Sequence, residues 1–576
     1  MIRTIFAAFA LFCLATGTGF GQTATAPLAT RGSDFRGSEV TARQGMVVAQ
    51  ESRAARIGVE ILERGGNAVD AAVAVGFAMA VTYPRAGNIG GGGFMLIHLA
   101  ATNKDIAIDY RETAPAAIHR DIFLDHKGDA DAEKSRFSAV AIGVPGTVAG
   151  LALAHEKYGS GNFTLADLLA PAIRLARDGI PVEDDTADSL SEYSSRFARW
   201  PASAKIFLRA DGSALREGDT LRQGDLAATL EIVARNGPRG FYDGPVAAKI
   251  ASAVRAAGGI MTADDLKNYR AIEREPVRGS YRDYDIVSMP PSSSGGTLLI
   301  EMLNILEGYP LGERPAGPAS LHLMIEAMKR AYADRAEFLG DPEAVEVPVD
   351  RLISKQYAAA ARRAIDPQRA RPSASIQAGR PAPEGENTTH YSVVDRFGNA
   401  VSNTYTLNFS YGVGLVAEGT GILLNNELDD FSAKPGVPNA FGLLGGAANA
   451  PAPGKRPLSS MTPTIVLKDN KPFLITGSPG GSRIITAVLQ VIVNVIDRGM
   501  PLGEAIAAPR LHHQWLPDQV SAERRMPIEV LQALQARGHT VVPSLGQTSA
   551  NSILVTPQAL VGAADPRTRG ALAAGY

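Results

Sequence analysis

Cysteine is almost absent from this sequence, with one residue, Cys13, among 576. A lone thiol cannot form a disulfide within the chain, and it cannot supply the cysteine set of a structural zinc site. Cys13 also lies in an N-terminal segment that we expect to be removed, as argued below. The remaining protein is therefore expected to have no disulfide and no thiol chemistry.

The sequence also lacks an excess of charge of either sign. The 57 Lys and Arg residues nearly balance the 59 Asp and Glu residues, which gives a net charge of −2. No basic surplus favours binding to nucleic acid, and no acidic tail indicates disorder. With 45% hydrophobic and 20% charged residues, the composition is that of a large globular protein.

Long hydrophobic runs and several common site motifs are missing as well. The closest candidate for a membrane span, Val69 to Val81, is short and carries Asp70, so we expect no span in the mature chain. No His-Glu-x-x-His pair or Gly-x-Ser-x-Gly elbow is present, and the adjacent His512 and His513 point in two directions on a helix or strand. The four glycines at 90–93 lack the Gly-Lys-Ser/Thr ending of a phosphate loop. We therefore expect neither a metal nor a cofactor.

The N-terminus has the pattern of a bacterial signal peptide. Arg3 supplies a positive charge, and Ile5 to Ala15 is an uncharged apolar segment too short to span a bilayer. Small residues suited to cleavage follow, so we expect a signal peptide within residues 1–26, cut between 21 and 26. Leu11-Phe12 before Cys13 does not fit a lipid anchor. The mature protein is expected to be periplasmic or secreted.

The character of the chain changes near residue 388. The first part is mostly helical, with expected helices at 51–64, 67–81 and 322–338, and strands at 46–49, 94–98 and 106–109. Strands dominate afterwards, at 391–394, 400–407, 422–425, 463–468 and 473–476, with one long helix at 482–498. This order predicts a fold with layers of sheet and helix.

The most informative run is Asn387-Thr388-Thr389-His390-Tyr391-Ser392-Val393-Val394-Asp395. A loop rich in Pro, Gly, Ser and Glu (366–387) precedes it, and a β-branched and aromatic strand follows. If the bond before Thr388 is cut, the new α-amine, with a pKa near ~8, lies on the same residue as the hydroxyl and can act as its base. The run therefore indicates an N-terminal nucleophile.

Four further motifs follow this junction. Thr406 and Asn408 are expected on the same face of one strand. Three acids lie between 427 and 430, after an apolar strand, where the rim of a pocket is plausible. Two hydroxyls, Ser459 and Ser460, lie between prolines, and Gly480-Gly481 precede a long helix, where backbone amides can stabilise an oxyanion.

In this order, these motifs closely resemble the gamma-glutamyltransferase (glutathione hydrolase) family across essentially the whole mature chain. Earlier matches are Tyr110-Arg111-Glu112, Pro145-Gly146 and Asp264-Leu266-Tyr269; later ones include Asn425 to Phe431, Pro457 to Met461, Gly477 to Arg483 and Asp565-Pro566-Arg567. The resemblance implies an α/β (α+β) Ntn-hydrolase fold, a four-layer αββα sandwich built from two autoprocessed subunits.

The resemblance also implies autocleavage between Asn387 and Thr388. The products would be a large subunit, 27–387, and a small catalytic subunit, 388–576, which together form one Ntn-hydrolase domain and a heterodimer. Thr388 would then attack glutathione or another γ-glutamyl compound, form a γ-glutamyl ester, and pass the group to water or to an amino acid or peptide acceptor.

The resemblance assigns a role to each matching residue. Arg111, with Ser459 and Ser460, would hold the α-carboxylate of the donor. Asn408, Glu427 and Asp430 would hold its α-ammonium. Thr406 would hydrogen-bond the nucleophile, and the amides of Gly480 and Gly481 would form the oxyanion hole.

Two positions depart from some bacterial members of the family. Glu427 stands where some relatives have Gln, and either side chain accepts a hydrogen bond from an ammonium. Residues 435–446 resemble a lid loop in which Phe441 replaces the usual Tyr. The loss of that hydroxyl predicts a more weakly latched lid.

Two alternative functions make different demands on these residues. A glutaryl or cephalosporin acylase on the same scaffold would act on a group without an α-amine, so it has less need of the paired acids that include Asp429 and Asp430. A non-catalytic exported solute-binding protein would be expected to have lost Thr388, Thr406 or the glycine pair. All of these residues are present.

Overall fold

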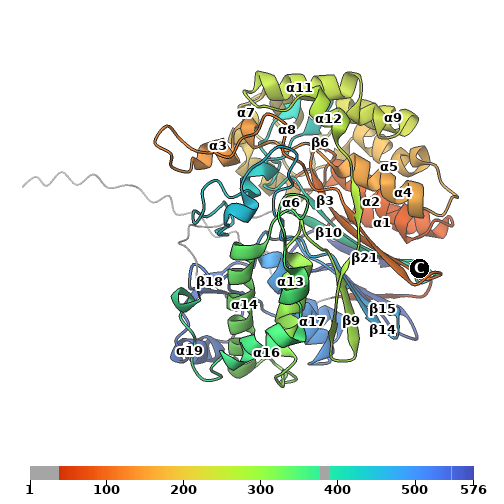
Figure 1. Ribbon diagram of the computed structural model, residues 1–576. Helices are drawn as coiled ribbons and strands as arrows, with labels where there is room; N and C mark the ends of the chain where they lie inside the picture. Colours follow the sequence, from red (N-terminus) through yellow and green to blue (C-terminus); the bar gives the residue numbers. More distant parts are fainter. Residues whose placement is uncertain (1–37, 377–387, 547) are drawn as a thin grey trace, which may run out of the picture. The chain divides into compact units, whose positions relative to one another are not determined.

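The computed structural model describes residues 38–376, 388–546 and 548–576 (Figure 1). The expected signal peptide, 1–26, and the expected cleavage residue Asn387 lie outside the described residues. Two antiparallel sheets of seven strands each form the centre of the fold.

The first sheet contains the strand that follows Thr388. Its strands, in spatial order, are β21 (Leu572–Gly575), β2 (Met46–Ala49), β10 (Thr389–Val394), β11 (Ala400–Thr406), β3 (Gly92–Leu99), β4 (Lys104–Asp109) and β7 (Ile272–Arg274). Strands from both sides of the expected cleavage point are therefore paired within one sheet.

The second sheet is also built from both parts of the chain. Its strands, in spatial order, are β1 (Glu39–Ala42), β20 (Leu560–Ala563), β19 (Ser552–Val555), β15 (Lys471–Thr476), β14 (Thr464–Lys468), β9 (Tyr284–Ser288) and β8 (Val277–Tyr281). The outermost strands on both edges come from residues before 388.

The two sheets pack face to face through the alternation of side chains along each strand. In β3, Phe94 and Leu96 belong to the core between the sheets, whereas Met95 and Ile97 belong to the core under the helices. Both faces of β3 are thus covered by an apolar core, so its sequence does not alternate between apolar and polar residues. Ile465 of β14 meets the inter-sheet core from the other side.

Helices cover the outer face of each sheet, so that the order of layers is helix, sheet, sheet, helix (Figure 1). This arrangement confirms the expected αββα sandwich. The first sheet is covered by α1 (Ser52–Glu63), α2 (Ala68–Thr82), α4 (Thr147–Tyr158), α5 (Leu165–Asp178) and α9 (Gly224–Asn236). The second is covered by α13 (Gly295–Leu306), α14 (Pro318–Phe338) and α17 (Arg483–Ile496).

Helix α2 explains the close packing of the first helical layer. All of its residues are buried, and its small alanines allow α1 and α5 to approach. Asn67 and Asp70 form a capping box at its start. In the described part of the chain, no helix combines the length and the apolar character needed to cross a bilayer.

Shorter elements connect these layers. The remaining helices are α3 (Ala132–Arg136), α6 (Asp184–Glu192), α7 (Ser194–Ala198), α8 (Pro201–Phe207), α10 (Arg239–Tyr242), α11 (Pro245–Ala256), α12 (Ala263–Asn268), α15 (Val349–Leu352), α16 (Lys355–Arg363), α18 (Leu502–Ala507) and α19 (Ile528–Ala536). The remaining strands are β5 (Ile180–Pro181), β6 (Thr220–Leu221), β12 (Val416–Ala417), β13 (Ile422–Leu423), β16 (Leu511–His512), β17 (Val520–Glu523) and β18 (Val541–Ser544). Single 3-10 turns occur at Ala139–Ala141, Ser373–Ser375, Glu427–Asp430 and Ala447–Asn449.

We predict that Leu96→Ala destabilises the protein strongly, because it empties space between two sheets that cannot easily collapse. The expected loss in the free energy of unfolding is about 2–5 kcal/mol. Ile528, which is 58% exposed, provides the control, since Ile528→Ala should change stability by about 0.5 kcal/mol or less. Thermal or urea denaturation followed by circular dichroism measures both. Equal unfolding midpoints for the two variants would contradict the assignment of Leu96 to the inter-sheet core.

Candidate active site

The site is centred on Thr388, which lies directly before β10 in the middle of the first sheet. The antiparallel register pairs Thr389 with Tyr405, so Thr388 and Thr406 lie at neighbouring strand ends. Thr388 is 7% exposed. In the uncut chain its nitrogen is part of a peptide bond, so the geometry is that of the precursor.

A cavity of about 280 Å³ contains most of the residues that the sequence predicted for the site. Of these, the ones that line it are Arg111, Thr388, Thr406, Asn408, Glu427, Asp430, Phe441, Ser459, Ser460 and Gly481. Leu443, Met461, Ser482 and Ile484 line it as well and were not predicted. Gly480 lies in an adjoining cavity that also reaches Thr388.

Thr406 and Asn408 lie together, although not as expected. Strand β11 ends at Thr406, and Asn408 has a φ of +73°, so the two residues do not share a strand face. The chain turns at this point, and the backbone N–H of Asn408 donates to the Thr406 hydroxyl at 2.9 Å. The Asn408 side chain donates to the carbonyl of Asn426 at 2.9 Å, which holds the turn against the acidic segment.

Arg111 occupies the floor of the cavity and is fully buried. Its Nε donates to the carbonyl of Pro457 at 3.1 Å, and its two terminal nitrogens pair with Glu427 and Asp430. Burial alone would disfavour the charged guanidinium. The two carboxylates outweigh burial and raise the pKa of Arg111 above its usual value. The predicted carboxylate-binding and ammonium-binding groups are therefore in direct contact.

The side chains of the acidic segment lie in two different places. Glu427 and Asp430 reach the cavity, whereas Asp429 accepts hydrogen bonds from Ser135 at 2.6 Å and from the N–H of Ala440 at 3.1 Å. Burial raises the pKa of Asp429 to about 6. A single 3-10 turn produces this division, which the sequence alone could not show.

Glu112 belongs to the motif Tyr110-Arg111-Glu112, but the sequence analysis did not predict it as a site residue. It is fully buried beside Glu427, and neither of its oxygens has a hydrogen-bond donor among the described residues. Burial raises the pKa of Glu112 to about 8, and it also raises the pKa of Glu427. Two buried carboxyl groups side by side are stable when they share one proton. The signal for Glu112 was its position next to Arg111.

Arg335 was missed entirely because it lies in the middle of α14, far from the site in sequence. Its guanidinium donates to the Ser294 hydroxyl at 3.0 Å and to the Ser460 hydroxyl at 3.3 Å. Burial lowers its pKa to about 10. Arg335 thus brings a second positive charge to the serine side of the cavity.

Gly480 and Gly481 occupy the turn between β15 and α17, as predicted. Their φ angles are +126° and +54°, a region that favours glycine. A Cβ on Gly481 would also lie 2.5 Å from the ring of Phe441. No described residue accepts a hydrogen bond from either amide, so both remain available to a ligand oxygen.

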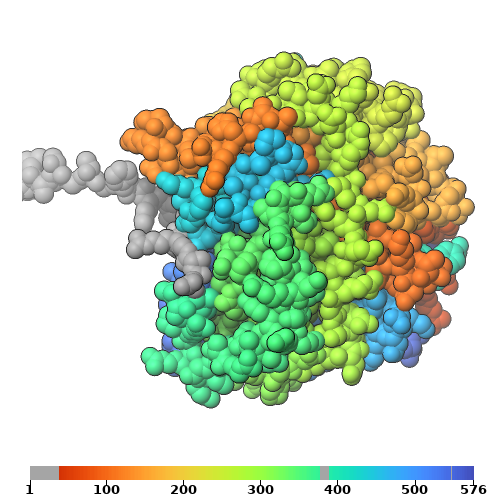
Figure 2. All heavy atoms as spheres, viewed as in Figure 1, coloured from red at the N-terminus to blue at the C-terminus, as the bar shows by residue number. Residues whose placement is uncertain are grey.

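Phe441 closes the cavity from the segment expected to form a lid. Its ring lies 6.1 Å from that of Phe409, and its carbonyl accepts a hydrogen bond from Gln514 at 3.1 Å. Asn439 of the same segment donates to Asp430 at 3.2 Å. In Figure 2 this segment is light blue and lies at the surface, between orange residues near 125 and green residues near 335. Lys434 contacts the orange region, and Gly446 contacts the green region.

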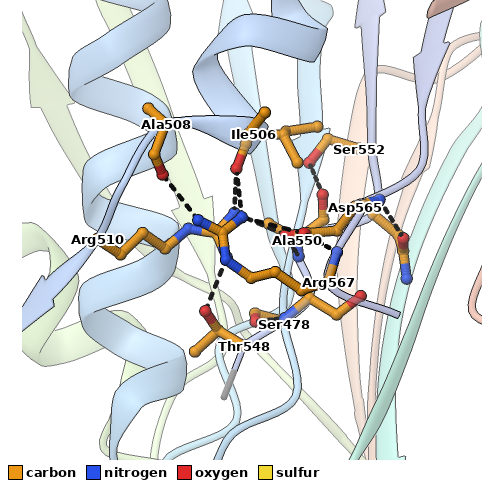
Figure 3. Close-up of polar contacts among 12 residues, drawn as sticks. Ser478, Ile506, Ala508, Arg510, Thr548, Ala550, Ser552, Asp565 and Arg567 are labelled. Carbon is orange, nitrogen blue, oxygen red and sulfur yellow. Dashed lines mark hydrogen bonds and ion pairs between the residues drawn. The ribbon is translucent and has the colours of Figure 1, made fainter. Parts of the chain in front are cut away.

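The adjoining cavity is larger, at about 610 Å³. Arg567, in its wall, is held by a buried network that also fixes Thr548 (Figure 3). Asp565 accepts hydrogen bonds from Arg510 at 2.7 Å and from Arg567 at 3.1 Å, while Arg510 donates to Thr548 at 2.7 Å. The network ties the C-terminal strands to the wall of the cavity.

One group of potential metal ligands occurs among the described residues, away from Thr388. It consists of His322, Glu326 and His539. The two imidazoles are hydrogen-bonded to each other at 2.8 Å, and Glu326 is paired with Lys329 at 3.0 Å. These contacts engage one nitrogen of each imidazole and the Glu326 carboxylate, while Nδ1 of His539 is buried without a hydrogen-bond partner among the described residues. The expectation of no cofactor stays a prediction.

Comparisons with known proteins identify the family of this chain. A family model described as gamma-glutamyltranspeptidase matches residues 54–575. The glutathione hydrolase proenzyme of Escherichia coli K12 is 52% identical over 540 residues, which cover 93% of each chain.

Two solved structures resemble the fold. A cephalosporin acylase from Bacillus halodurans has a TM-score of 0.82 at 29% identity, covering 96% of this chain and 98% of the acylase. A gamma-glutamyltranspeptidase structure from Helicobacter pylori has a TM-score of 0.55 at 45% identity, covering 56% of this chain and 93% of that one. The acylase is thus a related branch of the same scaffold. The match to the family model over nearly the whole described chain decides the assignment: the chain belongs to the gamma-glutamyltranspeptidase family and is an enzyme.

Proposed function

We propose that the chain is a precursor that cuts itself between Asn387 and Thr388. The Thr388 hydroxyl attacks the preceding carbonyl, the acyl group moves from nitrogen to oxygen, and water opens the resulting ester. The products are the subunits 27–387 and 388–576, which remain one heterodimeric domain. The name of the E. coli relative, a proenzyme, and the position of Thr388 between two cavities support this proposal.

The mature enzyme then acts on glutathione and other γ-glutamyl compounds. The free amine of Thr388 is the base and its hydroxyl is the nucleophile, with Thr406 orienting that hydroxyl. The amides of Gly480 and Gly481 stabilise the oxyanion, and the γ-glutamyl ester passes to water or to the amine of an amino acid or peptide. One observation carries the proposal: the residues suited to bind a glutamyl head group share a single cavity with Thr388.

The charges in the cavity fit an α-amino acid. Arg111, Ser459 and Ser460 would hold the α-carboxylate. Asn408, Glu427 and Asp430 would hold the α-ammonium. Because Arg111 already pairs with both acids, a zwitterion can insert between them and give each charged group a new partner.

A glutaryl acylase is the second candidate, and the cavity disfavours it. A glutaryl group has a carboxylate but no ammonium. It would take Arg111 away from Glu427 and Asp430 and leave these buried acids without a cation, at a high cost.

A periplasmic or secreted location is proposed from the N-terminal sequence pattern alone.

Autocleavage is tested by the mass of the purified protein. Wild type is expected to give two fragments, the smaller starting at Thr388, whereas Thr388→Ala is expected to stay whole because it has no attacking hydroxyl. Thr389→Ala is the matched control, since Thr389 is also buried but follows the junction, and it should still be cut. A single uncut wild-type chain, or cleavage of Thr388→Ala, would reject the nucleophile.

The raised pKa of buried Glu112, which lies beside Glu427, predicts proton release when a glutamyl ligand binds. A ligand ammonium favours the ionised pair, so the raised pKa of Glu112, about 8, must fall on binding. At pH 7 wild type should release up to about one proton per molecule of bound L-glutamate. Affinity should accordingly rise as the pH increases toward 8.

Glu112→Gln removes the titrating carboxyl with little change of shape, so it should release markedly less proton. Calorimetry in two buffers of different ionisation enthalpy counts the protons directly. The same proton number in both proteins would show that Glu112 does not titrate on binding.

The weaker latch of the lid predicts a change in the fate of the ester. In Phe441→Tyr an added hydroxyl should hold the segment more firmly and exclude water, raising the ratio of transfer to hydrolysis by about 2- to 10-fold, the value of one hydrogen bond. Phe441→Leu, which has no hydroxyl, should not raise it. The ratio of transfer to hydrolysis is measured with glycylglycine as acceptor. Identical ratios in wild type and Phe441→Tyr would contradict the prediction of a weaker latch.

A further inference from the structure

A buried group of three metal-ligating side chains lies among the helices that cover the second sheet. His322 and Glu326 are one turn apart on α14, so their side chains share one face of the helix. His539 follows α19, which packs against α14 (Figure 1). One ligand atom from each residue lies within 4.8 Å of the other two. No local motif predicted this group, because His539 lies 217 residues after His322.

Hydrogen bonds fix the tautomer of His322. Its Nε2 contacts the carbonyl of Asp366 at 2.8 Å, and a carbonyl can only accept, so this nitrogen carries a proton. In the neutral ring Nδ1 then has a lone pair, which lies 2.8 Å from Nε2 of His539. A histidine that binds a metal commonly donates its second ring nitrogen to a backbone carbonyl in this way.

His539 is held incompletely. Its Nε2 donates to His322, so its Nδ1 has a lone pair, and this atom is buried without a hydrogen-bond partner among the described residues. Burial, with the nearby Lys329, lowers the pKa of His539 to about 3, so the ring is neutral at pH 7. A neutral imidazole is the form that binds a metal. If Nε2 binds the metal, its proton can move to the unpartnered Nδ1, and the ring stays neutral.

The spacing of the two imidazoles is close to that of a metal site. Two nitrogens on one tetrahedral zinc ion lie about 3.3 Å apart, because each Zn–N bond is about 2.0–2.1 Å long. His322 Nδ1 and His539 Nε2 are 2.8 Å apart. The rings therefore need to separate by only about 0.5 Å to accept the ion.

Glu326 supplies an oxygen and a negative charge. Lys329 and the backbone N–H of Arg371 both donate to the same Glu326 oxygen, at 3.0 and 3.3 Å, and no described residue donates to the other oxygen. Glu326 also lines a cavity of about 640 Å³, which gives an ion a path to the carboxylate. Lys329 lies 3.6 Å from Asp518 as well, so two carboxylates flank one ammonium. The local charge is negative and favours a cation.

We propose that His322, Glu326 and His539 bind a divalent metal ion of the zinc type. Two imidazole nitrogens and one carboxylate oxygen are a ligand set that suits zinc, and they leave a fourth position for water. His322 and Glu326 precede Thr388 and His539 follows it, so the ion bridges the two parts of the chain. The site lies apart from Thr388, goes beyond the proposed function and does not depend on it.

The test measures Zn²⁺ binding to the full chain, prepared without a polyhistidine tag and stripped with a chelator. Competition with a coloured chelator gives the affinity and the stoichiometry. Wild type should bind one Zn²⁺ per molecule, and bound Zn²⁺ should raise the midpoint of thermal unfolding. Mg²⁺ should do neither, because it prefers an octahedral set of oxygen ligands.

Two conservative variants each remove one ligand. His539→Gln keeps an N–H donor for His322, and Glu326→Gln keeps an oxygen acceptor for Lys329. Each variant should weaken Zn²⁺ binding at least about 10-fold, since losing a group that only supports a ligand already costs about 10- to 100-fold.

His513→Asn is the matched control. His513 is also buried, but it is bonded to Asp518 at 3.2 Å and accepts from the N–H of Trp515 at 3.0 Å. Asn keeps an acceptor for Trp515, so this variant should bind Zn²⁺ as wild type does. X-ray absorption at the zinc edge of wild type should show two imidazole ligands, and this measurement needs no variant.

The outcomes decide the proposal. Absence of stoichiometric Zn²⁺ from wild type, fewer than two imidazole ligands, or unchanged affinity in either ligand variant would overturn it. An equal loss of affinity in His513→Asn would also overturn it, because the effect would then come from general packing. A wild-type chain that stays uncut at Thr388 but binds one Zn²⁺ would reject the cleavage proposal and leave the metal site in place.

Discussion

The buried contact of Arg111 with Glu427 and Asp430 is the interaction on which the site depends. It joins the end of β4 to the 3-10 turn at Glu427–Asp430, so it connects residues from both sides of Thr388. A buried ion pair costs much of its attraction in lost hydration, and it contributes little net stability. Its value here is that the charges are already dehydrated and oriented before a substrate arrives.

The two sheets provide the rigidity that this contact requires. Arg111 follows β4, the acids follow β13, and Thr388 precedes β10, so each group is placed by the end of a strand. Strand ends in a packed sandwich move little, because the alternating side chains of each strand are fixed in two cores. The turn residues between them, such as Asn408, then select which side chains face the cavity.

Much of this could be predicted from the sequence, and the limits have physical reasons. The long helices and the strands around Thr388 were expected because their periodicity and caps are local signals, as at Asn67. Strands β7, β8 and β9 and the C-terminal β19 to β21 were not recognised, and β13 is shorter than expected, because short half-buried strands lack a clear period.

Residue patterns singled out Thr388 and the motifs after it, but their roles and the place of Arg111 came from the family resemblance. The buried partners Glu112 and Arg335 could not be assigned in this way, because their contacts depend on how distant elements pack. Arg335 reaches Ser460 only because α14 packs against α13, which lies on the second sheet. The expected common strand face of Thr406 and Asn408 was wrong because a positive φ at Asn408 ends the strand.

The pairing of strands from both parts of the chain within each sheet has a consequence for assembly. In the first sheet β2 pairs with β10 and β3 with β11; in the second, β1 pairs with β20 and β9 with β14. While the chain is continuous, these pairings form within one molecule and at a rate independent of concentration. After a cut before Thr388, separated halves would have to find each other by diffusion and rebuild two sheets at once. Once the chain is cut, the lifetime of the protein would depend on its rate of unfolding, because loss of the fold would be hard to reverse.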